Sequence, residues 1–120
     1  MISKVIRRKS NRERRKIRIR NRVFGTPEMP RLTVFRSNKY TYGQIIDDTI
    51  GVTLVASGQE VRQLHQGAKK SVAAQECGKL LAQKALKAKI AKVVFDRNGY
   101  LFTGRVADFA KGAREGGLKF

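Results

Sequence analysis

Side chains of the kinds that bind RNA are concentrated in one stretch of the chain, residues 31–48, which reads RLTVFRSNKYTYGQIIDD. Arginine and lysine bind phosphates, tyrosine rings stack on unpaired bases, and the amides of asparagine and glutamine recognise base edges. The stretch supplies all of these types in Arg31, Arg36, Ser37, Asn38, Lys39, Tyr40, Tyr42 and Gln44. It therefore predicts a surface that binds RNA.

The same stretch has the pattern of a β-hairpin. Side chains alternate between two faces along residues 31–36 and again along residues 40–46, which is the period of half-buried strands. Ser37-Asn38-Lys39 supplies a turn between them. After a second turn at residues 47–51, a third strand is expected over Val52–Ser57. The residues that we expect to share one face of it are Val52, Leu54 and Ala56.

Two helices and a fourth strand are expected further along the chain. Residues 57–66 are polar and suit a surface loop. Residues 67–89 lack proline and carry apolar side chains at helical spacing, so they predict a long amphipathic helix. Residues 91–96 include three consecutive apolar side chains and predict a strand that is buried on both faces. A second helix is expected over residues 106–113, ending at Gly116-Gly117.

This order of three strands, a helix, a strand and a helix predicts an α/β fold. We expect a three-layer arrangement in which a mixed sheet, made of an antiparallel three-strand meander plus one parallel strand, is covered by two helices. A chain of 120 residues is long enough for one core and too short for two ordinary domains. The core is expected in one domain over residues 26–120.

The chain carries a large excess of positive charge. It has 27 lysine and arginine residues against 9 acids, a net charge of +18 and a pI near 11.0. The excess is greatest in an arm over residues 1–25, where residues 4–22 hold eleven basic side chains and one acid. A polyanion relieves their mutual repulsion, so the arm predicts nucleic-acid binding. Its candidate RNA contacts are Arg7, Arg8, Lys9, Arg12, Arg14, Arg15, Lys16, Arg18, Arg20 and Arg22.

The arm has a start signal for a helix but no apolar stripe. Ser10 followed three residues later by Glu13 is a capping-box pattern, and it predicts a helix that runs toward Arg22. Because the few apolar residues form no stripe, we expect the arm to have nothing to bury against its own domain. It would be disordered when free and helical close to RNA. A solvated tail that only aids solubility is the alternative interpretation.

A second group of candidate RNA contacts follows the fourth strand. It consists of Arg97, Asn98, Gly99 and Tyr100, with Arg105 beyond them. Gly99 lets the backbone come close, so that the Tyr100 ring can reach an unstacked base. For each of Tyr40, Tyr42 and Tyr100, packing with a hydrated hydroxyl is an equally good interpretation. The side chains expected in the core instead are Phe35, Phe95 and Phe109. The lysines at 69, 70, 79, 84, 87 and 89 are expected on a solvated helix face.

Several short segments resemble the bacterial and organellar ribosomal protein L18 family, over roughly the whole chain. The most specific are Pro30-Arg31-Leu32, Val34 to Lys39, Gln44 to Asp48, Val93 to Val106 and the ending Ala113 to Phe120. The resemblance implies an α/β fold with a ribonuclease H-like motif and a non-catalytic role. That role is to bind 5S ribosomal RNA and help to attach it to 23S ribosomal RNA in the central protuberance of the large subunit. Neighbouring large-subunit ribosomal proteins would be further partners.

The chain departs from the family pattern in three places. Where the family favours Asp-Arg-Gly-Gly-Tyr and then Tyr-His-Gly-Arg-Val, residues 96–100 read Asp-Arg-Asn-Gly-Tyr and residues 102–106 read Phe-Thr-Gly-Arg-Val. A histidine contact is thereby lost. The family's Ala-Gly near the terminus is Gly116-Gly117 here, and the loop over residues 57–66 is short for the family.

A metal-dependent nuclease with a ribonuclease H-like fold is one alternative function. It needs several converging carboxylates, one of them ordinarily on the first strand, and that strand has no acid. The remaining candidates are Asp47, Asp48, Glu76 and Asp96. We interpret the first two as turn residues and Asp96 as an anchor for Arg97 or Arg105. His65 and Cys77 lack the spacing of a zinc site. We therefore expect no catalytic residue, no metal and no cofactor.

A general polyanion binder, directed at an acidic membrane surface or an acidic protein, is the other alternative. A membrane binder needs an apolar face on the arm, and Ile6, Ile17 and Ile19 are too sparse to form one. Cys77 is the only cysteine, no apolar run has the length of a membrane span, and no secretory signal begins the chain. We expect a reducing, aqueous compartment: a ribosome of the cytoplasm or of an organelle, with no membrane and no small-molecule substrate as partner.

Overall fold

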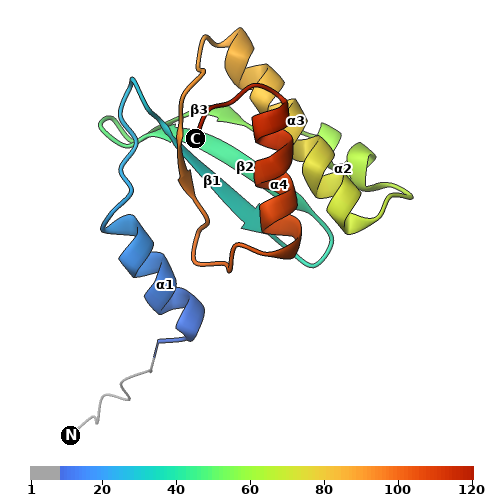
Figure 1. Ribbon diagram of the computed structural model, residues 1–120, viewed down its shortest axis with the longest axis horizontal. Coiled ribbons are helices and arrows are strands. Elements are labelled where there is room, and N and C mark those ends of the chain that lie inside the picture. The colour runs from blue at the N-terminus through green and yellow to red at the C-terminus, as the bar shows by residue number, and fades with distance from the viewer. Residues whose placement is uncertain (1–8) are drawn as a thin grey trace, which may run out of the picture.

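The computed structural model describes residues 9–120, which form four helices and four strands (Figure 1). In chain order these are α1 (Asn11–Arg20), β1 (Arg31–Arg36), β2 (Thr41–Asp47), β3 (Val52–Ala56), α2 (Glu60–His65), α3 (Lys70–Lys87), β4 (Val94–Asp96) and α4 (Gly104–Glu115). Within the described residues, no helix has the length and apolar character needed to cross a membrane. Arg7 and Arg8, two of the candidate RNA contacts, lie outside the described residues.

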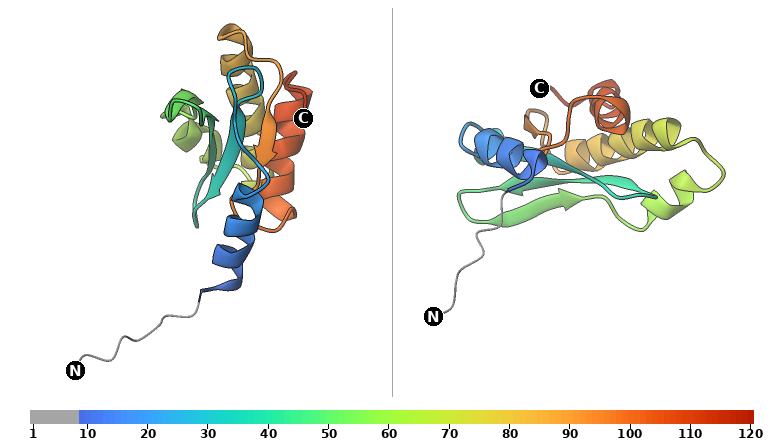
Figure 2. Two further views of the ribbon diagram at one scale, coloured as in Figure 1. Left: turned by 90° about the vertical axis from the view of Figure 1, so that its left-hand side faces the viewer. Right: turned by 90° about the horizontal axis from the view of Figure 1, so that it is seen from below.

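The four strands form one mixed sheet in the order β3-β2-β1-β4. β1 and β2 pair antiparallel, as do β2 and β3, whereas β4 joins β1 in parallel. The two long helices, α3 and α4, lie side by side on the same face of this sheet (Figure 2). The expected α/β class, the three-strand meander, the parallel strand and the two covering helices are all confirmed.

The core lies between the sheet and the two long helices. Leu32 and Val34 of β1 and Ile45 of β2 are completely buried, and they belong to one cluster with Leu81 of α3 and Phe109 of α4. Their spacing in β1 is the period of two that places alternate side chains on the covered face. The core position expected for Phe109 is therefore confirmed.

Two glycines bring α3 and α4 into close contact. A Cβ atom at Gly78 would collide with backbone atoms of Phe109 and Ala113, and one at Gly112 would collide with the backbone of Gln75. Only a residue without a side chain fits at either position. These two glycines therefore allow the close packing of α3 against α4.

The third strand has a single buried residue. The three residues expected to share a face, Val52, Leu54 and Ala56, are all exposed, and Val55 is the buried one. The pairing of β2 with β3 also shifts in register, because Ile45 pairs with Val55 whereas Ile46 pairs with Thr53, which leaves Leu54 as an extra residue in β3. β3 is also an edge strand, so it has a neighbour on one side only.

The segment expected to be a surface loop contains the short helix α2. His65 at its end accepts a hydrogen bond at Nε2 from the Thr41 amide (3.2 Å), so Nδ1 carries the proton and donates to the Val61 carbonyl (2.7 Å). The Tyr40 ring meets the imidazole edge-on, with 5.3 Å between centroids. His65 therefore fastens α2 to the start of β2. Cys77 lies close by, and burial raises the pKa of its thiol to about 11.

Candidate nucleic-acid interface

The helix of the basic arm begins where the sequence predicts. The Glu13 amide donates to Ser10 Oγ (3.1 Å) and the Ser10 amide donates to Glu13 Oε2 (3.3 Å), which is the complete capping box. No residue of α1 is fully buried, in keeping with the missing apolar stripe.

Contrary to expectation, this helix contacts its own domain through polar groups. Arg12 Nη2 donates to the Asn98 carbonyl (3.2 Å) and Arg15 Nε donates to the Gly99 carbonyl (2.9 Å). Gly99 has a φ of +78°, and a Cβ atom there would lie 2.6 Å from the Arg12 carbonyl oxygen. Apolar periodicity could not reveal this contact, because backbone carbonyls and guanidinium groups make it.

Tyr100 is a packing residue rather than an exposed ring. It is 7% exposed, and the guanidinium carbons of Arg12 and Arg36 lie 4.0 Å and 5.1 Å from its ring centroid. Of the two interpretations that the sequence left open, the structure supports packing. A base cannot stack on this ring in the observed conformation, because cations and backbone already cover it.

Arg31, a predicted phosphate contact, is engaged in ion pairs inside the domain. Its Nε and Nη2 donate to both carboxylate oxygens of Asp48 (2.9 and 3.1 Å), and its Nη1 donates to Asp96 (2.8 Å). The Arg31 side chain is only 11% exposed. Burial alone would lower the pKa of Arg31, but the two carboxylates outweigh it and raise that pKa.

The acids near the sheet have structural partners. The Arg31 hydrogen bond is the main cause that lowers the pKa of Asp48 to about 2, and the Gly25 amide contributes. Asp96 binds Arg31 and the Asn98 amide, instead of the expected Arg97 or Arg105. Asp47 accepts from the Thr49 amide (3.0 Å) and is the turn residue that was predicted. Among the described residues, no group of three or more acids, histidines or cysteines is placed to hold a metal ion.

The face of the sheet opposite α3 and α4 carries a shallow hollow of about 280 Å³. We call it the open face; it is lined by Thr33, Phe35, Tyr42, Gly43, Gln44 and Asn98. The Phe35 and Tyr42 rings pair across the strands with 5.0 Å between centroids. Aromatic surfaces and amide groups thus lie together at a site where bases can stack and be recognised.

Phe35 was expected in the core, and that expectation is wrong: its side chain is 40% exposed. The covered face of β1 is already taken by Leu32 and Val34, so the alternation places Phe35 on the other side. The same alternation, applied to β1 alone, would have found both Phe35 and Thr33. We expected Phe35 in the core because phenylalanine is usually buried.

The turn between β1 and β2 presents polar groups at the end of the hairpin. Asn38 and Lys39 are exposed, and Ser37 Oγ accepts from the Tyr40 amide (3.0 Å). Arg36 lies on the β1 side of this turn, where its backbone bonds the Tyr100 hydroxyl. The hairpin and the 97–100 turn are thereby joined.

Arg105 extends the basic region beside Arg36. It is half-buried, and its Nη1 is a buried nitrogen without a hydrogen-bond partner among the described residues. Burial is the main cause that lowers the pKa of Arg105, and the charge of Arg36 adds to it. An unpaired, partly desolvated guanidinium gains more from an anion than a fully hydrated one does.

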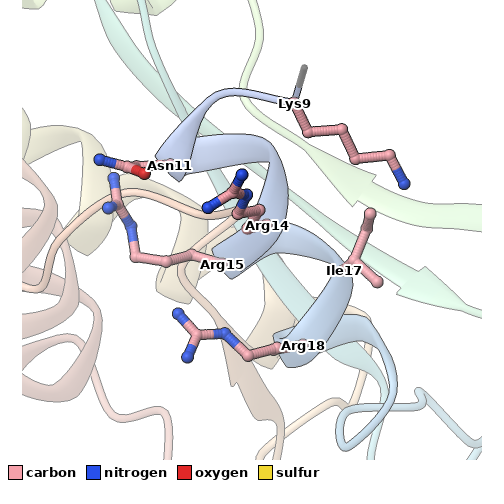
Figure 3. Close-up of a pocket in the computed structure, with 6 residues that line it drawn as sticks. All are labelled: Lys9, Asn11, Arg14, Arg15, Ile17 and Arg18. Atoms are coloured by element: carbon pink, nitrogen blue, oxygen red, sulfur yellow. The ribbon is translucent and has the colours of Figure 1, made fainter. Parts of the chain in front are cut away.

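The outer side of α1 forms an open groove of about 530 Å³ (Figure 3). Its lining residues are Lys9, Asn11, Arg14, Arg15, Ile17 and Arg18. Arg15 and Arg18 project from the same side of the helix, one turn apart (Figure 3). No carboxylate lines the groove, so it is a strongly positive strip along the helix. Most of the predicted arm contacts are therefore placed on one exposed element.

These features are those of a nucleic-acid-binding α/β domain: an aromatic and polar sheet face, two polar turns and an arginine-rich helix beside them. The comparisons with known proteins identify which kind. A model of the family "Ribosomal L18 of archaea, bacteria, mitoch. and chloroplast" matches residues 6–120.

Individual relatives agree with the family match. The large ribosomal subunit protein uL18 of Thermotoga petrophila is 55% identical over 115 residues, which cover 93% of this chain and 94% of the relative. The uL18 protein of Symbiobacterium thermophilum is 52% identical over 124 residues, with full coverage of both chains. That of Clostridium tetani is 50% identical over 113 residues, covering 94% and 95%.

The chain belongs to the ribosomal L18 family, as the sequence resemblance indicated. It is a structural protein of the large ribosomal subunit, it binds ribosomal RNA, and its partners include other ribosomal proteins. It is not an enzyme, because the family consists of structural ribosomal proteins.

Proposed function

We propose that this protein binds 5S ribosomal RNA and helps to attach it to 23S ribosomal RNA in the central protuberance of the large subunit. Membership of the L18 family supports the proposal, because the resemblance implies this RNA. The observation that carries it is the contact of α1 with the 97–100 turn. That contact sets a row of arginines beside an open sheet face that also includes Asn98.

The two parts of the interface have different tasks. The open face and its neighbouring turns recognise the shape and the unpaired bases of a folded RNA, because they bring paired aromatic rings and amide groups together on one surface. The arm, residues 1–25, neutralises phosphates and reaches a second region of RNA. We do not include Arg31 and Tyr100 among the proposed RNA contacts, because Arg31 is paired with Asp48 and Asp96 and the Tyr100 ring is covered by Arg12 and Arg36. The proposed contacts in the folded part are Arg36, Ser37, Asn38, Lys39, Tyr40, Tyr42, Gln44, Arg97, Asn98, Gly99 and Arg105.

The salt dependence of 5S RNA binding tests this division. In the full chain, Arg14→Gln with Arg18→Gln removes two exposed charges from α1 without touching the contacts of Arg12 and Arg15. We expect the slope of log affinity against log salt to fall by about one to two, while the protein still prefers 5S RNA. Lys87→Gln, at the opposite end of the domain from α1, is the charge control (Figures 1 and 2).

An unchanged slope in the double variant would show that α1 does not contact phosphates. A general polyanion binder is the second candidate, favoured by the net charge of +18. It predicts equal slopes and equal affinities for every structured RNA of the same length.

A further inference from the structure

A second hollow, of about 160 Å³, lies between α1 and the turn that follows β4. Its lining residues are Arg15, Arg18, Ile19, Arg22 and Arg97. The groove of Figure 3 is formed by α1 and the preceding Lys9 alone, whereas this hollow joins the arm to the domain. A cavity that holds a single water has a volume of roughly 10–15 Å³. The hollow is therefore large enough for a phosphate group with several waters.

Two of the four arginines are held in place by backbone carbonyls. Arg15 Nε donates to the Gly99 carbonyl (2.9 Å), and Arg97 Nη1 donates to the Tyr100 carbonyl (2.6 Å). A guanidinium has five N–H donors, so each of these side chains is fixed by one bond and has further donors for another partner. Side chains that are already ordered lose little entropy when they bind an anion.

The hollow lacks a compensating negative charge among its lining residues. Asp48, in the turn after β2, and Asp96, at the end of β4, are bound to Arg31. The C-terminal end of α1 contributes a partial charge of only about −0.5, against four guanidinium groups. The remaining repulsion opposes the approach of α1 to the domain unless an anion occupies the hollow.

We propose that this hollow is a site for one backbone phosphodiester of RNA, bound jointly by the arm and the domain. The phosphate oxygens accept from the remaining donors of Arg15 and Arg97, and from Arg18 and Arg22 at the exposed side. The bound anion links α1 to the 97–100 turn and stabilises their contact. That the phosphate comes from ribosomal RNA rests on the proposed function; the anion site itself does not.

The site is tested in the full chain with simple phosphates. Inorganic phosphate, or dimethyl phosphate as the mimic of a diester, replaces chloride at constant ionic strength, and the backbone amides of Ile19 and Gly99 are followed by NMR. We expect saturable shifts of these amides with both phosphates. Arg18→Gln, whose side chain makes no hydrogen bond within the described residues, should weaken the binding about tenfold, the loss of one charge-assisted bond. Lys87→Gln should leave it unchanged.

Shifts that rise linearly without saturation, or that are as large in Arg18→Gln as in the native chain, would overturn the site. Binding of inorganic phosphate but not of dimethyl phosphate would overturn its assignment to an RNA backbone. Failure here is separable from failure of the proposed function. Saturable phosphate binding without a preference for 5S RNA over transfer RNA would support the anion site and contradict the 5S assignment. A preference for 5S RNA without saturable phosphate binding would contradict the anion site alone.

Discussion

The Tyr100 hydroxyl donates to the Arg36 carbonyl (3.2 Å) and accepts from the Arg36 amide (3.3 Å), so one side chain fastens the end of β1 to the turn after β4. These two residues are 64 positions apart in the sequence. Arg12 covers the same ring from the arm. Tyr100 therefore organises three parts of the interface without being exposed itself.

Replacing Tyr100 by phenylalanine should destabilise the domain. The ring still packs, but the Arg36 amide and carbonyl lose their partner, which costs about 1–2 kcal/mol in the free energy of unfolding. Urea unfolding of both proteins measures the difference. Tyr42→Phe is the control, because among the described residues no hydrogen bond of the Tyr42 hydroxyl is found, and it should change stability little. Equal effects of the two substitutions would contradict the role given to Tyr100.

Acid should weaken the protein through Asp48. The pKa of Asp48 is about 2 in the folded state, below its ordinary value of 3.8, so the folded state binds this proton less readily than the unfolded chain does. The stabilisation is complete above about pH 4 and is lost as the pH falls toward 2. It amounts to about 2 kcal/mol.

Asp48→Asn tests this origin of acid sensitivity. Unfolding free energies measured between pH 5 and pH 2 should fall less steeply in the variant than in the native chain, although the variant is less stable at pH 5. The pKa values of Glu60 and Glu115 are also lowered, but both side chains are exposed, so solvent screens their effect. Parallel curves would show that another group causes the acid sensitivity.

Substitution of Gly99 should release α1 from the domain. Alanine at this position must adopt a positive φ and also collides with the Arg12 carbonyl. Gly67→Ala is a matched control: its φ is +66°, and nothing lies within 4 Å of the added Cβ. Both variants bear backbone strain of about 1 kcal/mol, but only Gly99→Ala loses the contact.

Limited trypsin digestion distinguishes the two glycine variants, because a helix released from the domain unfolds more readily and trypsin cleaves unfolded backbone at arginine. We expect faster cleavage within residues 11–20 and weaker RNA binding in Gly99→Ala only. Equal cleavage rates in both variants would mean that the contact between Gly99 and α1 does not hold the helix on the domain.

The open face predicts a loss of RNA affinity without a loss of folding. Phe35→Ala removes an exposed ring that can stack on a base, which is worth about 1–3 kcal/mol of binding. Ile50→Ala removes another exposed apolar side chain, in the turn between β2 and β3 and outside the open face, and should bind RNA normally. Filter binding and thermal unfolding of both variants separate the effects. Normal RNA affinity in Phe35→Ala would remove the open face from the interface.

Local patterns in the sequence predicted most of the fold. Alternation identified β1 and β2, apolar spacing identified α3 and α4, and Ser10 with Glu13 located the start of α1. These features depend on residues a few positions apart. The register shift between β2 and β3 also lies within one strand pair, but no residue type in the sequence indicates it.

The site was harder to predict, because its decisive contacts join distant residues. Arg31 has the same side chain as the arginines of the arm, and only its pairing with Asp48 and Asp96 distinguishes it from them. Tyr100 is buried by groups from the arm and from β1. Composition therefore gave the kind of partner correctly, whereas the choice among individual arginines and tyrosines needed the three-dimensional structure.

The function proposed for this domain is the recognition of 5S ribosomal RNA. Its most direct test is the affinity of the full chain for labelled 5S RNA at near-physiological salt, with unlabelled transfer RNA or unlabelled 5S RNA as competitor. We expect 5S RNA to displace the label at far lower concentration than transfer RNA does. Equal displacement by the two RNAs would contradict 5S recognition and leave only charge-driven binding.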